Sequence, residues 1–389
     1  MSVKLNDSQY IANTYARFPL EIVSGNGSYA YDENGKEYID LATGIAVNTF
    51  GFSDKEWVSA VTTQLSKLQH TSNLYYTEPC VNLAKVLCKR TGMKKVFFSN
   101  SGAEANECAI KVARKYAELN NKKDSKIITL VNSFHGRTVT TLAATGQQTF
   151  HNDFLPLTEG FLYAEANNLE SVHKIVEQNT VSAIMFECVQ GEGGVMPLTK
   201  DFVHGVSELA KEKGILLIVD EVQTGNGRTG ELYAYMNYGI SPDIVTTAKG
   251  LGGGLPLGAT MLSDKVENVL TPGSHGSTFG GNPVCCAGAL NIINRIDDRI
   301  LKEVKEKSKL IFDTLTNAEG VISISGMGLM IGIETTRDAT EIISECMQNG
   351  VLVIKAKNKI RLLPALNIPN NLLLKALDVI KTACAGKEN

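Results

Sequence analysis

The feature that most constrains the fold is a regular alternation of short apolar runs and amphipathic stretches between about residue 90 and residue 285. The apolar runs are VFF (96–98), KIITLV (126–131), VSAIMFECV (181–189), ILLIVDE (215–221) and DIVTTAK (243–249). Buried strands of a parallel sheet are continuous apolar runs of this kind, and helices cover both faces of such a sheet. The sequence therefore predicts an α/β protein with a mostly parallel central sheet, whose ligands bind at the carboxyl ends of the strands.

The segments on either side of this block predict a second, smaller unit. GSYAYDENGKEYIDLATGIAV (27–47) has an Asn-Gly turn typical of a β-hairpin, residues 285–318 are helical in pattern, and 321–335 and 350–364 favour strands. A chain of 389 residues is long enough for two domains. We expect a large α/β domain over residues 51–284. Residues 1–50 and 285–389 should form a small α+β domain.

The charge balance argues against nucleic acid or a membrane as partner. The chain has 38 Lys and Arg residues against 41 Asp and Glu, a formal net charge of −3, and no clustered basic face. No apolar run approaches the about 20 residues that a membrane helix needs, and the start of the chain lacks the apolar core of a secretion signal. We expect a cytosolic protein that acts on small molecules.

The eight cysteines and six histidines show neither a disulfide framework nor a metal-ligand pattern. The sequence contains no C-x-x-C pair, and several cysteines, such as Cys188, lie inside apolar runs. This distribution is typical of reduced, partly buried thiols. We expect no metal site.

The run ILLIVDE is unusual because a strand of fully buried type ends in two carboxylates, Asp220 and Glu221. A buried carboxylate is unfavourable unless it is paired or hydrogen-bonded. In the simpler interpretation Asp220 caps the following turn or pairs with Arg228. In the other interpretation it binds a ligand.

A second candidate is FFSNSGAEANE, in which a strand is followed by small residues and then by a helix. The first N–H groups of a helix have no partner within it, and together with the helix dipole they favour an anion such as phosphate. The alternative is an ordinary helix cap formed by Asn100 or Ser101.

The glycine-rich stretch KGLGGGLPLGA (249–259) is not a nucleotide-binding loop, because its lysine precedes the glycines instead of following them. Lys249 comes directly after the apolar run IVTTA, which predicts partial burial. Burial lowers the pKa of a lysine and frees its amine for Schiff-base chemistry. The alternative is the usual solvated surface lysine.

These three features fit one cofactor when they are taken together. A lysine that forms an imine, a helix start that binds phosphate and an acid at a strand end are the three anchors that pyridoxal phosphate requires. An ionised Asp220 would keep the pyridine nitrogen of the cofactor protonated, so that the ring withdraws electrons from the reacting carbon.

Over nearly its whole length the sequence resembles the class III, or ornithine-type, aminotransferases of fold type I. The matching segments, in the order typical of that family, are NSGAEANE, SFHGRT, ECVQGEGGV, IVDEVQTGNGRTG, TTAKGLGGGLPLGA, HGSTFGGNP and RLLPAL. Any one segment is only suggestive, but the set is highly specific. The resemblance implies a fold type I pyridoxal-phosphate-dependent transferase.

The resemblance also implies a role for each matching residue of the cofactor site. Lys249 matches the Schiff-base lysine and Asp220 the partner of the pyridine nitrogen, so these two are the expected catalytic residues. Phe134 and Val222 should pack on the two ring faces, with Gln223 near the ring hydroxyl. The cofactor-binding residues implied are Ser101, Gly102, Ala103, Phe134, Asp220, Glu221, Val222, Gln223, Lys249 and Thr278. Thr278 matches a threonine that contacts the phosphate from the neighbouring subunit, which implies a homodimer with shared sites.

The substrate residues that the resemblance implies are Arg137, Arg361, Ser277, Glu187 and Glu192. The two arginines match those that hold substrate carboxylates, a task suited to their planar, bidentate guanidinium groups. Glu192 and Arg361 match a paired acid and arginine, which we expect to act as a switch between the two substrates.

Two departures from the family pattern stand out. Cys188 replaces the usual proline of an E-P-x-Q-G-E motif, and we expect this change to be tolerated because the position supplies strand geometry and no chemistry. Gly51-Phe52-Ser53-Asp54 replaces a G-H-x-H-P-like stretch near the site entrance, which leaves the substrate preference open.

The activity implied is transfer of an amino group between glutamate and the terminal position of N-acetylornithine, as in arginine biosynthesis. Succinylornithine, ornithine or 4-aminobutyrate are alternative amine donors. An isomerase like glutamate-1-semialdehyde aminomutase has the same fold and lysine but needs no 2-oxoglutarate. A cofactor-binding role without catalysis is disfavoured by the presence of Lys249, Asp220 and both arginines.

Overall fold

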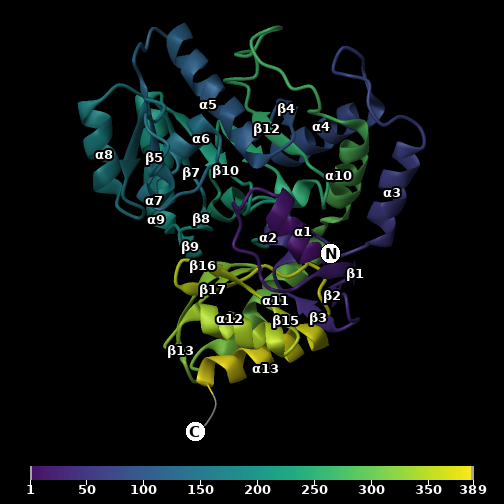
Figure 1. Cartoon of the computed structure of the whole chain (residues 1–389). Coiled ribbons are helices and arrows are strands. Elements are labelled where there is room, and N and C mark those ends of the chain that lie inside the picture. Colours follow the sequence, from purple (N-terminus) through teal and green to yellow (C-terminus); the bar gives the residue numbers. More distant parts are fainter. Residues whose placement is uncertain (1, 387–389) are drawn as a thin grey trace.

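The computed structural model describes residues 2–386 and is built around a seven-stranded sheet in the order β4-β12-β11-β10-β7-β5-β6 (Figure 1). The strands are β4 (Lys95–Ser99), β5 (Lys126–Leu130), β6 (Phe161–Ala164), β7 (Val181–Phe186), β10 (Leu216–Asp220), β11 (Ile244–Thr247) and β12 (Gly258–Leu262). Strands β11, β10, β7, β5 and β6 pair in parallel, whereas β12 is antiparallel to both β11 and β4. The predicted mostly parallel α/β sheet is confirmed.

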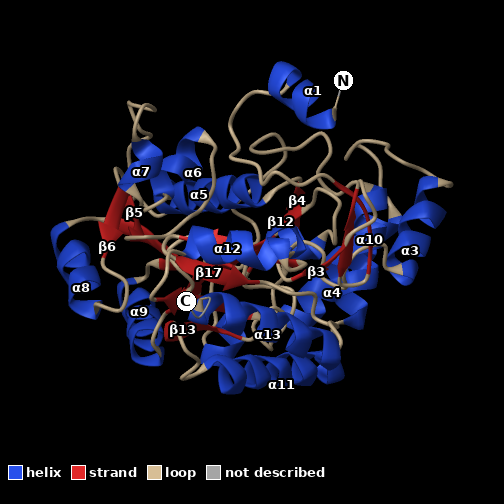
Figure 2. Ribbon diagram, turned by 60° about the horizontal axis from the view of Figure 1, so that its bottom comes forward, coloured by secondary structure: helices blue, strands red, loops and turns tan. Residues whose placement is uncertain are grey.

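Helices cover both faces of this sheet (Figure 2). The side chains of β10 alternate between these two faces. Leu216 and Ile218 pack in one apolar cluster with helix α5 (Gly102–Leu119), while Leu217 and Val219 pack in another with helix α9 (Lys200–Lys213). Successive residues of a strand point to opposite faces. Asp220 therefore points to the α5 side of the sheet and Glu221 to the other side.

The remaining elements of this part of the chain connect the strands or pack around them. They are α3 (Lys55–Leu65), α4 (Glu78–Thr91), α6 (Val139–Ala144), α7 (Gln148–His151), α8 (Leu169–Gln178), the short strands β8 (Val189–Gln190) and β9 (Met196–Pro197), and the 3₁₀ turns η1 (Ala234–Tyr238) and η2 (Lys249–Leu251).

The smaller unit contains two four-stranded sheets, with orders β1-β2-β3-β15 and β13-β14-β17-β16. Its elements are α1 (Val3–Tyr10), β1 (Ile22–Asn26), β2 (Tyr29–Asp32), β3 (Glu37–Asp40), α2 (Thr43–Ala46), α11 (Asp298–Leu315), β13 (Val321–Met327), β14 (Met330–Thr335), α12 (Ala339–Gln348), β15 (Val351–Leu352), β16 (Ile354–Ala356), β17 (Lys359–Leu362) and α13 (Asn370–Ala385). β2 and β3 form the predicted hairpin, and β3 pairs with β15, so this hairpin lies against the C-terminal part (Figure 1).

Helix α10 (Pro283–Arg295) joins the two units. It begins at the proposed boundary of residue 284 and packs against α3 and α4. Division of the chain into residues 51–284 on one side and 1–50 with 285–389 on the other stays a prediction. Within residues 2–386 no helix has the length and apolar character needed to cross a bilayer, and no group of three His, Cys, Asp or Glu side chains is placed to hold a metal ion.

Candidate functional site

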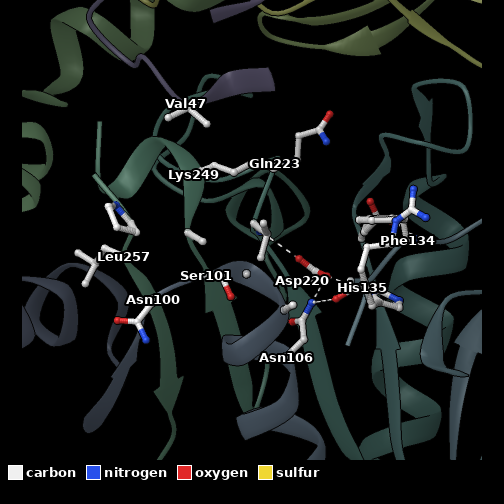
Figure 3. Close-up of a pocket in the computed structure, with 18 of the residues that line it drawn as sticks. Val47, Asn100, Ser101, Asn106, Phe134, His135, Asp220, Gln223, Lys249 and Leu257 are labelled. Atoms are coloured by element: carbon white, nitrogen blue, oxygen red, sulfur yellow. Dashed lines mark hydrogen bonds and ion pairs between the residues drawn. The ribbon is translucent and has the colours of Figure 1, made fainter. Parts of the chain in front are cut away.

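A cavity of about 490 Å³ lies at the carboxyl ends of β4, β5, β10 and β11 (Figure 3). Ten predicted site residues line it: Ser101, Gly102, Ala103, Phe134, Arg137, Glu187, Asp220, Val222, Gln223 and Lys249. They come from segments far apart in the sequence, and the parallel sheet brings them together because each follows the end of a strand. The structure thus brings these ten residues to one cavity, where the sequence predicted a ligand.

Asp220 is held in place by donors on both of its carboxylate oxygens. Oδ1 accepts a hydrogen bond from the Val222 N–H at 3.0 Å, and Oδ2 lies 2.7 Å from Asn106 Nδ2 and 2.8 Å from His135 Nδ1 (Figure 3). Asn106 is in turn fixed by Thr246, whose hydroxyl donates to Asn106 Oδ1 at 2.7 Å. This network orients a buried, ionisable carboxylate toward the cavity.

Neither Asn106 nor His135 was predicted as a site residue. Both are buried and both line the cavity. The sequence could have indicated Asn106, because it is a polar residue among the alanines and cysteine on the buried face of α5. His135 Nε2 is buried without a partner in the described part of the chain, while its Nδ1 faces Asp220.

Arg228 does not pair with Asp220, so the simpler interpretation of the strand-end carboxylate fails in that respect. Its guanidinium donates to the carbonyls of Leu329 and Pro364. Glu221 also lies away from the cavity lining. Its carboxylate accepts hydrogen bonds from the Tyr235 N–H at 2.8 Å and the Thr224 hydroxyl at 2.6 Å, and burial raises its pKa to about 7. The structure thus brings Asp220, but not Glu221, into the site.

Lys249 extends into the cavity from the turn that follows β11. Burial lowers the pKa of its amine to about 8, from an ordinary value of 10.5, and the nearby Glu192 only partly opposes this effect. A lysine of this kind has an accessible neutral amine near neutral pH, the form that attacks a carbonyl carbon.

The start of α5 offers two free N–H groups to the cavity. The Ser101 hydroxyl caps the helix by accepting a hydrogen bond from the Glu104 main-chain N–H. The same hydroxyl donates to the Glu104 carboxylate, so this pair uses its hydrogen-bonding groups on each other. The N–H groups of Gly102 and Ala103 have no acceptor among the described residues. A Cβ on Gly102 would lie 2.5 Å from Val222 Cγ1, so only glycine leaves this space open. The expected cap by Ser101 therefore occurs, and it leaves two N–H groups that an anion could bind; the anion cradle stays a prediction.

Together these groups fit pyridoxal phosphate. The helix start would offer N–H donors to its phosphate, Asp220 a carboxylate to its ring nitrogen, and Lys249 an amine to its aldehyde. Phe134 and Val222 line the same cavity, with Phe134 following β5 and Val222 following β10.

Arg137 lies at the edge of the cavity and is solvent-exposed. Its guanidinium stacks on the Phe150 ring, 4.2 Å from the ring centre, and lies 5.6 Å from that of Phe134. It forms no ion pair with any described residue. The guanidinium is therefore available to a carboxylate from solution.

Arg361 and Glu192, which do not line the cavity, form an ion pair with Nη1 and Oε1 2.6 Å apart. Arg361 Nη1 also donates to Gln223 Oε1 at 3.2 Å, which links the pair to the cavity. Burial alone would raise the pKa of Glu192, but Arg361, with smaller contributions from Lys249 and Gln223, holds this pKa below its ordinary value. Arg361 Nε is buried without a described partner.

Glu187 is buried and binds main-chain groups. It accepts the Phe134 N–H at 2.9 Å and the Gly191 N–H at 3.3 Å, and burial raises its pKa to about 7. The carboxylate thus ties the loop that carries Phe134 to the QGEGG turn. Its predicted contact with substrate stays a prediction.

Ser277 and Thr278 lie at different places relative to the cavity. Ser277 Oγ accepts Asn100 Nδ2 at 3.2 Å, and Asn100 lines the cavity. Thr278 is exposed and lines a separate hollow of about 130 Å³ together with Tyr76 and Cys80. Within one chain, therefore, Thr278 is not brought to the cofactor cavity.

The two departures from the family pattern have structural roles. Cys188 is buried, burial raises the pKa of its thiol well above the ordinary value, and its carbonyl accepts the Leu198 N–H at 3.0 Å. Asp54 accepts the Trp57 N–H at the start of α3 and forms an ion pair with Arg295. Neither Cys188 nor Asp54 lines the cavity.

Comparison with known proteins agrees with this geometry. Residues 10–384 match the family described as aminotransferase class-III. The chain is 49% identical to an acetylornithine aminotransferase of Haemophilus ducreyi, with 97% of each chain covered, and 43% identical to a succinylornithine transaminase of Salmonella newport, with 97% and 95% covered. A structure of the ornithine aminotransferase of Toxoplasma gondii, reported with partial occupancy of pyridoxal phosphate at its active site, superposes with a TM-score of 0.93 at 30% identity, covering 98% of this chain and 93% of the other.

Proposed function

The chain belongs to the class-III aminotransferases, and we propose that it exchanges an amino group between N-acetylornithine and 2-oxoglutarate, giving N-acetylglutamate 5-semialdehyde and glutamate. The observation that carries this function is one cavity containing a lysine amine of lowered pKa, a fixed carboxylate and an unpaired helix start. The relatives named acetylornithine aminotransferase support the amine donor, which belongs to arginine biosynthesis.

Pyridoxal phosphate supplies an electron-withdrawing ring that stabilises negative charge on the substrate carbon. The chain's own residues hold and orient the reactants. Asp220, fixed by Asn106 and His135, would hold the ring nitrogen with its carboxylate, and the N–H groups of Gly102 and Ala103 would bind the phosphate. The amine of Lys249, with its pKa near 8, can both accept and return a proton at neutral pH.

The ion pair of Arg361 and Glu192 would determine which amine of a substrate reacts. Glutamate reacts through its α-amine and acetylornithine through its terminal amine, although both carry an α-carboxylate. With the pair open, Arg361 would draw that carboxylate close. With the pair closed, as in this structure, the longer substrate would place its carboxylate on the exposed Arg137. Opening exchanges one ion pair for another, so its free-energy cost is small.

Glu192→Ala tests this switch. We expect the glutamate half-reaction to stay within about twofold of wild type and the acetylornithine half-reaction to slow by about tenfold to a hundredfold, since a charged hydrogen bond contributes about 1.5–3 kcal/mol. Single-turnover absorbance of the cofactor follows each half separately. Glu192→Gln keeps a hydrogen-bonding oxygen, so its rate in the acetylornithine half-reaction should fall between those of wild type and Glu192→Ala. Equal losses in both halves would contradict the switch.

The amine donor is tested by steady-state rates with N-acetylornithine, N-succinylornithine, ornithine and 4-aminobutyrate, each with 2-oxoglutarate. N-acetylornithine should give the highest kcat/KM. A higher value for N-succinylornithine would favour the second candidate, which the Salmonella relative supports. Turnover without 2-oxoglutarate would point instead to an isomerase.

We also propose that two copies form a homodimer in the cytosol, with Thr278 of each copy at the site of the other. Thr278 is exposed, and large apolar side chains gather in its neighbourhood, with Tyr76 99% and Phe279 60% exposed. Exposed apolar patches of this kind mark protein interfaces. The cytosolic location is a separate expectation from the sequence, which cell fractionation would test.

The dimer is tested by sedimentation of wild type and two variants. Wild type should sediment at twice the chain mass of 42.1 kDa. Phe279→Asp should sediment as a monomer and lose activity. Ile322→Asp, at a site equally exposed on β13, should leave the mass unchanged. A monomeric, fully active wild type would refute the shared site.

A further inference from the structure

The main chain at Lys249 has a backbone conformation that a lysine rarely adopts. Its φ is +46°, in the left-handed region that favours glycine. Such conformations persist only where surrounding groups hold them, and they gather at functional sites. Two side chains, those of Asn226 and Thr49, bond to the residues next to Lys249.

Asn226 holds the residues that precede the lysine. It lies in the segment after β10, is buried, and donates from Nδ2 to Thr247 Oγ1 at 3.1 Å and to the Ala248 carbonyl at 3.2 Å. Its own φ is +57°, which asparagine tolerates better than most residues. It neither lines the cavity nor contacts Asp220. Its amide therefore holds the main chain of Ala248 and the side chain of Thr247, the two residues that precede Lys249.

Thr49 holds the residue that follows the lysine. It lies between α2 and α3, is buried, and donates from Oγ1 to the Gly250 carbonyl at 2.8 Å. Gly250 is packed tightly here, because a Cβ on it would lie 2.8 Å from Thr49 Oγ1 and 3.4 Å from Asn226 Cβ. Thr49 and Asn226 thus hold the main-chain carbonyls of the residue before Lys249 and of the residue after it.

We propose that Thr49 and Asn226 are positioning residues for the reaction, a pair that we call the lysine clamp. By fixing the Ala248 and Gly250 carbonyls, the lysine clamp imposes the left-handed turn at Lys249 and so directs its amine into the cavity. This inference rests on the proposed covalent role of Lys249. It adds two residues that touch neither substrate nor cofactor but set where the amine stands.

Two forms of the cofactor separate positioning from simple structural support. Pyridoxal phosphate carries an aldehyde: the lone pair of the Lys249 amine attacks its carbon, the oxygen leaves as water, and a carbon–nitrogen double bond forms that borohydride reduces. Pyridoxamine phosphate carries an amine in place of the aldehyde and binds only through non-covalent contacts. A displaced lysine slows capture of the first form alone, whereas a damaged cavity weakens both.

The experiment compares three clamp variants with a matched control, using protein freed of cofactor and then reloaded. Thr49→Val removes the hydroxyl, Thr49→Ser keeps it, and Asn226→Gly removes the amide while glycine accepts the positive φ. Thr129→Val is the control, because Thr129 is a buried threonine of β5 whose hydroxyl has no described partner.

We expect Thr49→Val and Asn226→Gly to capture pyridoxal phosphate about tenfold to a hundredfold more slowly, the loss typical of a misplacement near 1 Å. Their affinity for pyridoxamine phosphate should stay within about twofold of wild type. Thr49→Ser and Thr129→Val should match wild type in both measurements. Wild-type capture rates in Thr49→Val and Asn226→Gly, or parallel losses with both cofactor forms, would overturn the lysine clamp. A wild type that forms no reducible adduct would instead overturn the proposed function.

Discussion

Replacing Lys249 with alanine is expected to give a folded protein that binds pyridoxal phosphate only reversibly and turns over about 10⁴-fold or more slower than wild type. A positioned proton-transfer group alone contributes about 10²–10⁴-fold, and the covalent attachment is lost as well. Borohydride should fix the cofactor to the peptide containing residue 249 in wild type and to no peptide in the variant, as mass spectrometry of digests would show. The same reducible adduct in Lys249→Ala would prove the assignment wrong.

The pH dependence of wild-type capture provides an independent check on Lys249. Only the neutral amine attacks the aldehyde, and burial lowers the pKa of this amine to about 8. The capture rate should therefore rise with pH and level off above about pH 8, well below the ordinary lysine value of 10.5. Lys359→Ala is a suitable control, because burial also lowers the pKa of Lys359, which lies outside the cavity.

Asp220→Asn is expected to reduce turnover by about 10³-fold, near the upper end of the effect of removing one preorganised electrostatic group. A neutral amide cannot hold the ring proton. In either orientation, the NH₂ group of the new asparagine would face another hydrogen-bond donor, because the Val222 N–H faces one oxygen of Asp220 and Asn106 Nδ2 faces the other. We therefore expect a loss of about 1–3 kcal/mol in the free energy of unfolding, typical of a buried donor left unpaired.

The matched control for Asp220 is Asp243→Asn at the opposite end of the same strand pair. Asp243 accepts the Leu217 N–H at 2.9 Å and pairs with Lys265, and it does not line the cavity. This variant should keep near-normal turnover. Near-normal turnover in Asp220→Asn would leave the strand-end carboxylate without its proposed role, and thermal unfolding of both variants would separate stability from chemistry.

Local sequence patterns were enough to locate the site because parallel strands bring their carboxyl ends to one edge. Lys249 and Asp220 each follow an apolar run, and both line the cavity. A second regularity explains why Glu221, also predicted to bind the cofactor, does not line the cavity. Side chains alternate along a strand, so Leu216, Ile218 and Asp220 face α5 while the next carboxylate faces the other side.

Other features depend on contacts that no local pattern reveals. Thr49 and Asn226 are 177 residues apart, yet both close on the turn at Lys249. The salt bridge of Glu192 with Arg361 joins β17 of the small unit to the QGEGG turn, and its two residues were paired in advance only through the family resemblance. Propensity and periodicity describe neighbours along the chain, whereas these contacts are set by tertiary packing.

Strand β4 occupies one edge of the central sheet, and β12 is its single neighbour, with Ser99 opposite Gly258 and Lys95 opposite Leu262. The helix start that would cradle the phosphate is therefore anchored to the sheet by a strand made about 160 residues later. Ribosomes add on the order of 5–20 residues per second, and contacts between residues distant in sequence form slowly. A nascent chain should thus be unable to load its cofactor until residue 262 has left the ribosome, which sets a minimum delay between synthesis of the phosphate cradle and its first use.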